Sequence, residues 1–141
     1  MPLTKPLLLI AALTILTTPA IAAMPDASIP PIQEVASAAP TGEAFGAAKR
    51  GTPLVLTSAD EASKYFGEEA LAALEDAVDF EKQTVLLFAW RGSGQDKLNY
   101  VVAESFPEQI TFSIQPGRTR DLRSHVKVFA LRKNVKWSAG R

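Results

Sequence analysis

The sequence predicts an α+β fold in which an antiparallel meander sheet of about four to five strands carries one short helical layer near its N-terminal side. Three observations favour this class. Helical apolar spacing is confined to residues 59–77, a continuous apolar run occupies residues 84–90, and the strand-like segments after this helical region are separated by short turns. Strands joined by short turns usually pair as antiparallel neighbours. At 141 residues, the chain is long enough for one domain with one core.

The helical part follows a short apolar strand predicted over residues 53–57. Ser58, followed three residues later by Glu61, has the form of a capping box, in which the serine accepts a backbone hydrogen bond and the glutamate reaches back. We therefore expect a helix over residues 59–66 and a second helical piece over residues 68–77.

The remaining strands are recognised by their apolar patterns. Residues 84–90 are apolar at nearly every position, which is typical of a strand that is covered on both faces. Further strands are expected over residues 97–104, 109–115 and 123–131. Apolar and polar residues alternate in the segment 109–115, so one face of that strand should be exposed.

The N-terminal residues 1–22 have the features of a signal peptide. Lys5 precedes an apolar run over residues 7–16, and the small residues Ala20 and Ala22 come before the expected cleavage site. An uncleaved membrane anchor is the alternative, but the run is shorter than the roughly 20 residues that span a bilayer. We therefore expect a secreted or periplasmic protein with no stable membrane insertion after cleavage.

Residues 23–51 are rich in Ala, Pro and Gly, and this composition favours a mostly extended linker. An edge strand over residues 32–36 is the alternative for part of this segment. The single α+β domain is then expected over residues 52–138.

The composition excludes several kinds of site. The chain has no cysteine and one histidine, which excludes disulfides, cysteine-based zinc sites, a thiol nucleophile and any two-histidine metal site. No glycine-rich phosphate loop is present. We therefore expect no metal and no cofactor.

A catalytic role has weak support. Ser93 lies between two glycines, but the turn lacks the G-x-S-x-G pattern of a hydrolase nucleophile and is expected to join two strands. We therefore expect no catalytic residues and a non-catalytic protein. The alternative is an enzyme that acts on an extracellular polymer through His125 and carboxylates.

Charge is divided unevenly along the chain. Residues 26–81 contain 11 acids and 3 bases, whereas residues 82–141 contain 11 bases and 4 acids. Arginine and lysine bind carboxylate, sulfate or phosphate groups. The candidate binding residues for an anionic partner are Arg118, Arg120, Arg123, His125 and Lys127.

The partner expected from these residues is another exported protein or an anionic polymer. Nucleic acid is a poor match, because the protein is expected to be exported and its mature form carries no excess of positive charge. The alternative is that the arginines pair with the acidic helices of the same chain.

One stretch of the chain resembles a known family. The residues that carry the resemblance are Val78, Asp79 and Phe80, the apolar strand at 85–90, the turn glycines Gly92 and Gly94, and the strand residue Tyr100. Over about residues 52–104 the sequence resembles the PrcB C-terminal domain family. The resemblance implies a small exported α+β module, which in one lineage is an accessory component of a secreted protease complex. It implies no catalytic residues.

Overall fold

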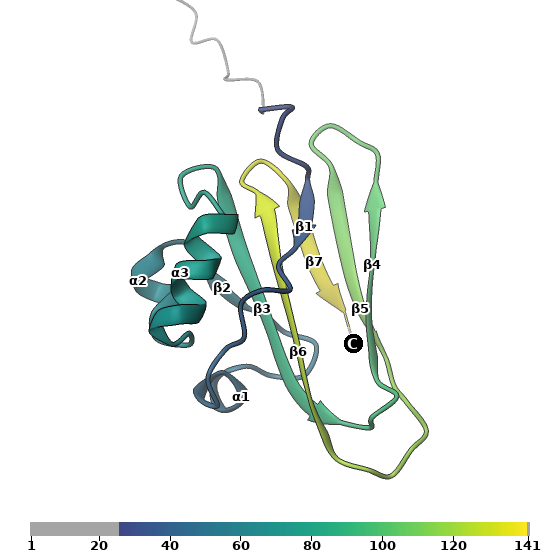
Figure 1. Cartoon of the computed structure of the whole chain (residues 1–141). Coiled ribbons are helices and arrows are strands. Elements are labelled where there is room, and N and C mark those ends of the chain that lie inside the picture. The colour runs from purple at the N-terminus through teal and green to yellow at the C-terminus, as the bar shows by residue number, and fades with distance from the viewer. Residues whose placement is uncertain (1–25, 141) are drawn as a thin grey trace, which may run out of the picture.

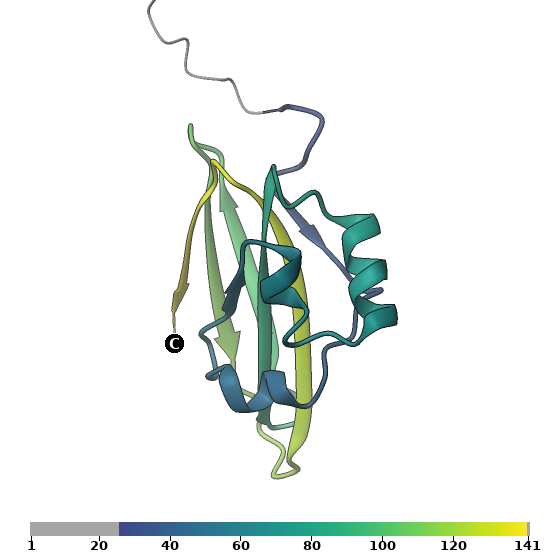
Figure 2. The same ribbon diagram turned by 90° about the vertical axis from the view of Figure 1, so that its left-hand side faces the viewer.

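The computed structural model describes residues 26–140 and confirms the predicted α+β class. The predicted signal peptide over residues 1–22 lies outside the described residues. Three layers are stacked: the helices, a four-stranded sheet and a three-stranded sheet (Figures 1 and 2). Within the described part of the chain, no helix is long and apolar enough to cross a membrane.

The elements have the following bounds. Sheet A contains, in spatial order, β1 (Ile32–Glu34), β6 (Arg123–Arg132), β3 (Gln83–Gly92) and β2 (Leu54–Leu56), and its neighbouring strands are all antiparallel. Sheet B contains β4 (Lys97–Ala103), β5 (Gln109–Gln115) and β7 (Lys136–Gly140), with β5 and β7 parallel. The helices are α1 (Glu43–Ala47), α2 (Ala59–Ala62) and α3 (Glu68–Ala77).

Strand β3 is buried on both faces, as its apolar sequence predicts. Val85, Leu87 and Ala89 belong to a core shared with the helices. The alternate residues, such as Leu86 and Phe88, belong to a second core between the two sheets. Because successive side chains of a strand point to opposite faces, one apolar strand supplies both cores.

The core between the sheets is built around aromatic rings. The Phe88 ring lies 5.0 Å from that of Phe112 on β5, and the Phe112 ring lies 5.3 Å from that of Phe129 on β6. The Tyr100 ring lies 5.5 Å from the Phe129 ring in an edge-on arrangement. Tilted and edge-on ring pairs are the favoured geometries, so these contacts fix sheet B against sheet A.

The predicted capping box is present at the start of α2. The Ser58 hydroxyl accepts a hydrogen bond from the Glu61 backbone N–H at 3.2 Å. The Glu61 carboxylate reaches back one residue further than expected, to the N–H of Thr57 at 2.7 Å and its hydroxyl at 2.8 Å. Together these bonds direct the chain from β2 into the helical layer.

The prediction of one meander sheet is wrong. Strands β4 and β5 leave sheet A and form a separate sheet, and β6 returns to pair with β3 along ten residues. The physical reason lies in β3 itself, because a strand that is apolar on both faces needs a second layer to cover the face that the helices leave open.

The prediction of a linker is wrong from Ile32 onward, and the edge-strand alternative is confirmed for β1. Val35, Ala38 and Ala44 are buried in the core beneath the helices. These small side chains have no regular spacing, so their contribution to a core is not visible in the sequence. The folded unit therefore begins before residue 52.

Candidate functional site

The loops 93–96 and 116–122 lie side by side at the end of the sandwich where β3 ends and β6 begins. The Ser93 and Thr119 hydroxyls are 2.5 Å apart, and the Gly94 N–H donates to Asp121 Oδ1 at 3.0 Å. We call residues 91–97 and 115–127 the basic end, because this part of the molecule holds all five predicted binding residues.

Asp96 connects the two loops from the inside. Its carboxylate is buried, with 1% of the side chain exposed. Oδ1 accepts a hydrogen bond from the Gly117 N–H at 2.8 Å, and Oδ2 accepts bonds from the Trp90 indole and the Arg50 guanidinium, each at 3.1 Å. A buried carboxylate with three donors fixes the relative positions of β3, the loop 116–122 and the segment before β2.

The charged states of both loop aspartates follow from these bonds. The Gly117 N–H, with the Trp90 indole and Arg50, holds the pKa of Asp96 below its ordinary value, although burial opposes the shift. Bonds from the Thr119 hydroxyl, the Gly94 N–H and Arg123 hold the pKa of Asp121 far below its ordinary range. Both groups are carboxylates at neutral pH.

Gly117 allows the close approach of the loops. A Cβ at this position would lie 2.6 Å from Gln95 Cβ and 2.7 Å from the Gln95 carbonyl carbon. These distances are shorter than real side chains adopt, so the absence of a side chain at Gly117 permits the packing that Asp96 secures.

Arg118 and Arg120 project from this fixed loop. Both side chains are exposed, and neither forms an ion pair with any of residues 26–140. Arg123 differs, because its Nε donates to Asp121 Oδ2 at 2.7 Å. Two of the three predicted arginines are therefore available to an external anion.

The other two predicted residues lie on the same face of β6 as Arg123. Lys127 Nζ is 2.6 Å from Glu34 Oε1 of β1, on the surface. The His125 ring stacks on Trp90 at 4.9 Å, and its Nε2 is 2.7 Å from the Ser93 carbonyl oxygen, which accepts the hydrogen bond. His125 thus anchors the loop 93–96 to β6.

The cleft between β4 and β6 is small. It has a volume of about 250 Å³, its walls include Asn99 and Lys97 of β4 and Lys127 of β6, and Trp90 and His125 also line it. Cationic side chains therefore flank an aromatic pair.

The geometry gives no support to a serine-hydrolase arrangement. His125 contacts the Ser93 carbonyl, whereas the Ser93 hydroxyl is bonded to Thr119. A nucleophile and its base need to be within hydrogen-bonding reach of each other. Within residues 26–140 no group of three or more histidine, aspartate or glutamate side chains is placed to hold a metal ion.

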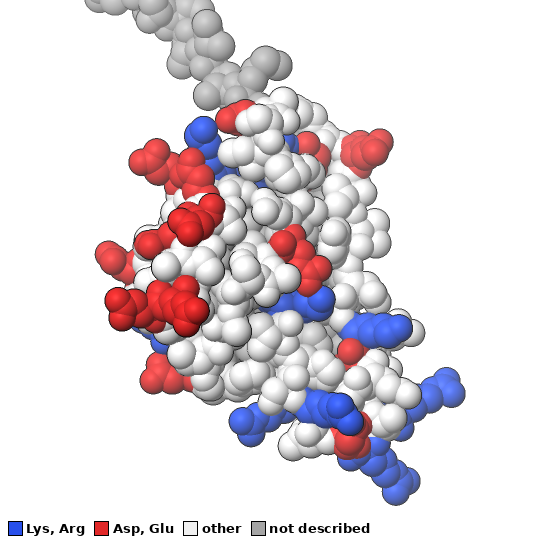
Figure 3. All heavy atoms as spheres, viewed as in Figure 1, with Lys and Arg blue, Asp and Glu red and all other residues white. Residues whose placement is uncertain are grey.

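The acidic helices lie away from the basic end. Figure 3 shows carboxylates gathered over the side of the molecule that α2 and α3 occupy in Figure 1, and lysines and arginines gathered at the end where β6 begins. None of the five ion pairs formed among the described residues joins a helical carboxylate to Arg118, Arg120 or Arg123. The alternative that these arginines hold the helices in place is therefore wrong.

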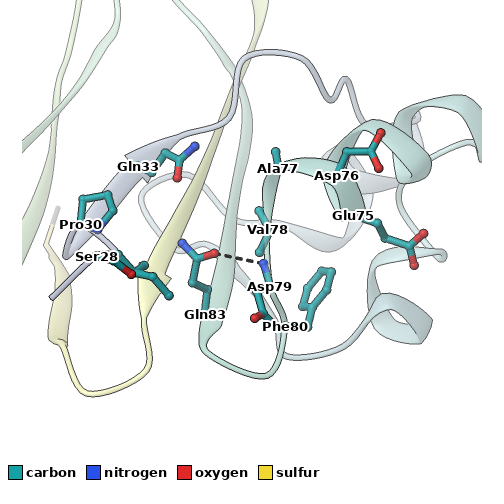
Figure 4. Close-up of a pocket in the computed structure, with 11 residues that line it drawn as sticks. Ser28, Pro30, Gln33, Glu75, Asp76, Ala77, Val78, Asp79, Phe80 and Gln83 are labelled. Carbon is teal, nitrogen blue, oxygen red and sulfur yellow. Dashed lines mark hydrogen bonds between the residues drawn. The ribbon is translucent and has the colours of Figure 1, made fainter. Parts of the chain in front are cut away.

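A second hollow lies at the opposite end of β3, between the chain that enters β1 and the end of α3 (Figure 4). Its volume is about 610 Å³, and Glu75, Asp76 and Asp79 lie along it. Gln83 Oε1 accepts a hydrogen bond from the Asp79 N–H at 3.1 Å (Figure 4). This groove is acidic, so it has the opposite character to the basic end.

The comparisons with known proteins yielded no relatives. No family model matches this chain, and no curated protein or solved structure is similar enough to count as a match. The resemblance to the PrcB C-terminal domain family stays a prediction.

Sequence reasoning missed the residues that hold the site together. Asp96 and Gly117 have the composition of ordinary turns. The two residues bond to each other across 21 residues of the chain, and no local pattern reports such a contact. Trp90 was the available signal, because a buried indole N–H needs an acceptor.

Proposed function

We propose that this protein is an exported, non-catalytic binding module whose basic end recognises an anionic partner, either an acidic surface of another exported protein or an anionic polymer. The observation that carries the proposal is the pair Arg118 and Arg120. Both are exposed, have no ion-pair partner among residues 26–140, and extend from a loop secured by Asp96.

The rigidity of the loop supports recognition. A loop that is already ordered loses little conformational entropy when it binds, so its charges contribute more fully to affinity. The separation of the basic end from the acidic helices also supports the proposal, because a field of one sign steers an oppositely charged partner towards one end of the molecule (Figure 3).

The role of His125 favours binding over catalysis. Its Nε2 is engaged by the Ser93 carbonyl, and its ring is stacked on Trp90. We infer that His125 positions the loop and takes no part in a reaction. The resemblance to an accessory-module family agrees with this role.

The test uses poly-L-glutamate and a sulfated polysaccharide as defined anionic probes. The double variant Arg118→Ala/Arg120→Ala is expected to bind the preferred probe about tenfold more weakly at low ionic strength, because each exposed charge contributes up to about 1 kcal/mol. Binding by the unmodified protein should weaken steeply with salt, since the Debye length falls from about 30 Å at 0.01 M to about 8 Å at 0.15 M.

The matched control is Lys64→Ala/Lys133→Ala, which removes the same charge from exposed positions outside the basic end. This variant should retain most of the affinity, and both double variants should keep the melting temperature of the parent protein. Equal losses in the two double variants would show that only net charge matters, and the proposal would then fail. The two probes distinguish an acidic protein from an anionic polysaccharide.

A further inference from the structure

Strand β6 is longer than the strand that covers its outer edge. β3 pairs with all ten residues of β6, from Arg123 to Arg132. On the other side, β1 pairs only with Phe129, Ala130 and Leu131. The first half of β6 therefore has a neighbouring strand on one side only.

The backbone groups on this open edge can be assigned. The Val35 N–H donates to the Val128 carbonyl at 2.8 Å, and the Arg132 N–H donates to the Pro31 carbonyl at 3.2 Å. The even-numbered residues of β6 thus direct their N–H and C=O groups towards the β1 side. By the alternation of a strand, Ser124 and Val126 do the same. Neither residue has a backbone partner on that side among residues 26–140.

The side chains along this edge alternate in character. Arg123, His125 and Lys127 pair with Gly92, Trp90 and Phe88 of β3 and lie on the face towards sheet B. Val126 lies on the other face and packs against the helical core, and Ser124 is exposed. One face of the edge carries the bases Arg123 and Lys127, whose ion pairs with Asp121 and Glu34 are solvent-exposed and can be exchanged for an incoming carboxylate. The other face is apolar or small.

We propose that the open edge of β6 at Arg123–Lys127 is the docking site for an extended acidic segment of the partner protein, which adds to sheet A as a strand in line with β1. This inference rests on the proposed function and specifies how its partner binds. The segment would exchange backbone hydrogen bonds with Ser124 and Val126. Its acidic side chains would alternate with small or apolar ones, because alternate positions meet the cations and the Val126 face.

The charges select this occupant over two others. A second copy pairing through the same edge would place Arg123 and Lys127 opposite like charges, which is unfavourable. Residues 1–25 of the chain contain no aspartate or glutamate, so the N-terminal segment lacks the complementary charge. Bases such as Arg123 and Lys127 on an open edge discourage pairing with most strands, and an acidic strand is the one that they favour.

The probe is a fluorescent octapeptide in which glutamate and valine alternate, and the measurement is fluorescence anisotropy with the folded protein. A second peptide has the same sequence but carries N-methyl groups on the amides of one edge, which removes strand pairing without changing charge. A third has lysine in place of glutamate. We expect the first peptide to bind, the N-methylated peptide to bind at least tenfold more weakly, and the lysine peptide not to bind.

Ser124→Pro tests the same edge from the side of the protein. Proline removes the outward N–H of residue 124, while the bonds to β3 use the alternate residues. We expect at least a tenfold loss of affinity for the glutamate peptide, whereas Ser124→Ala should stay within twofold of the parent. If Ser124→Pro does not fold, the comparison of the glutamate peptide with its N-methylated form still tests whether a strand is added at this edge.

Equal binding of the parent and N-methylated peptides, or no binding of the glutamate peptide to the folded protein, would overturn the inference. Binding of poly-L-glutamate and of the sulfated polysaccharide shows whether only this inference has failed or the proposed function has failed as well. If either probe still binds and loses affinity with Arg118→Ala/Arg120→Ala, the basic end recognises anions without strand addition. If all anionic probes fail, both proposals fail.

Discussion

Asp96 is the residue on which the geometry of the basic end depends most. Its three donors come from β3, from the loop before β6 and from the segment before β2. Removing the carboxylate would leave a buried indole N–H and a backbone N–H without an acceptor. An unpaired buried donor costs more than the mean contribution of the bond that it loses.

We therefore predict that Asp96→Asn lowers the free energy of unfolding by about 1–3 kcal/mol at pH 7, because the amide group presents donors to donors. Chemical denaturation measures the change. Glu104→Gln is the control, since Glu104 is an exposed acid with no ion pair among the described residues. A neutral effect of Asp96→Asn would contradict the central role of this carboxylate.

The loss of stability caused by Asp96→Asn should depend on pH. The pKa of Asp96 is lowered in the folded state, so its stabilising effect is fully present above the unfolded pKa, near 4, and is lost as the pH falls through the folded pKa. The difference in melting temperature between the parent and Asp96→Asn should therefore shrink as the pH is lowered from 5 to 2. A difference that stays constant over this range would assign the effect to packing.

Among the elements, β1 and the chain that follows it show how a segment without a periodic pattern joins a core. Val35 and Val55 have the same side chain, but Val35 is 4% exposed and Val55, on β2, is 45% exposed. Burial, not residue type, therefore decides how much each valine contributes to the stability of the folded protein. This pair therefore offers a direct measure of whether the segment before residue 52 belongs to the folded unit.

We predict that Val35→Ala lowers the free energy of unfolding by about 1.5 kcal/mol, because two buried methyl groups lose their contacts. Val55→Ala should change it by less than about 0.5 kcal/mol. Thermal unfolding followed by circular dichroism measures both. If Val35→Ala changed the free energy of unfolding as little as Val55→Ala, the segment containing β1 would not contribute to the core in solution.

Strands β3 and β5 and helix α3 were predictable because their apolar spacing reports burial directly, as Ile110 and Phe112 show by pointing inward. Strand β7 (Lys136–Gly140) was not, because only Ala139 packs against the core between the sheets, Trp137 is 36% exposed, and the strand pairs in parallel with β5. Arg132 is one of the 11 bases counted over residues 82–141, but it is buried and bound to Glu108 at 2.6 Å. Charge counted along a chain does not report which cations are already paired.

At the scale of the whole molecule, the two cores share the strands β3 and β6. Leu87 lies in the core beneath the helices, and Phe88 lies in the core between the sheets. A defect on either face of β3 changes the packing of a strand that the other core also needs. Small domains with such shared elements unfold as one cooperative unit.

We predict that Phe88→Ala lowers the free energy of unfolding by about 3–5 kcal/mol, and Leu87→Ala by about 2–5 kcal/mol. Each variant should shift two signals together: tryptophan fluorescence, to which the buried Trp90 of the inter-sheet core contributes, and circular dichroism at 222 nm, to which the helices contribute. Val101→Ala, at a position that is 70% exposed on β4, is the control and should leave both transitions unchanged. If Phe88→Ala moved the fluorescence transition alone, sheet B would be able to separate from a folded sheet A. The basic end could not then stay fixed, because Asp96 joins loops that belong to both sheets.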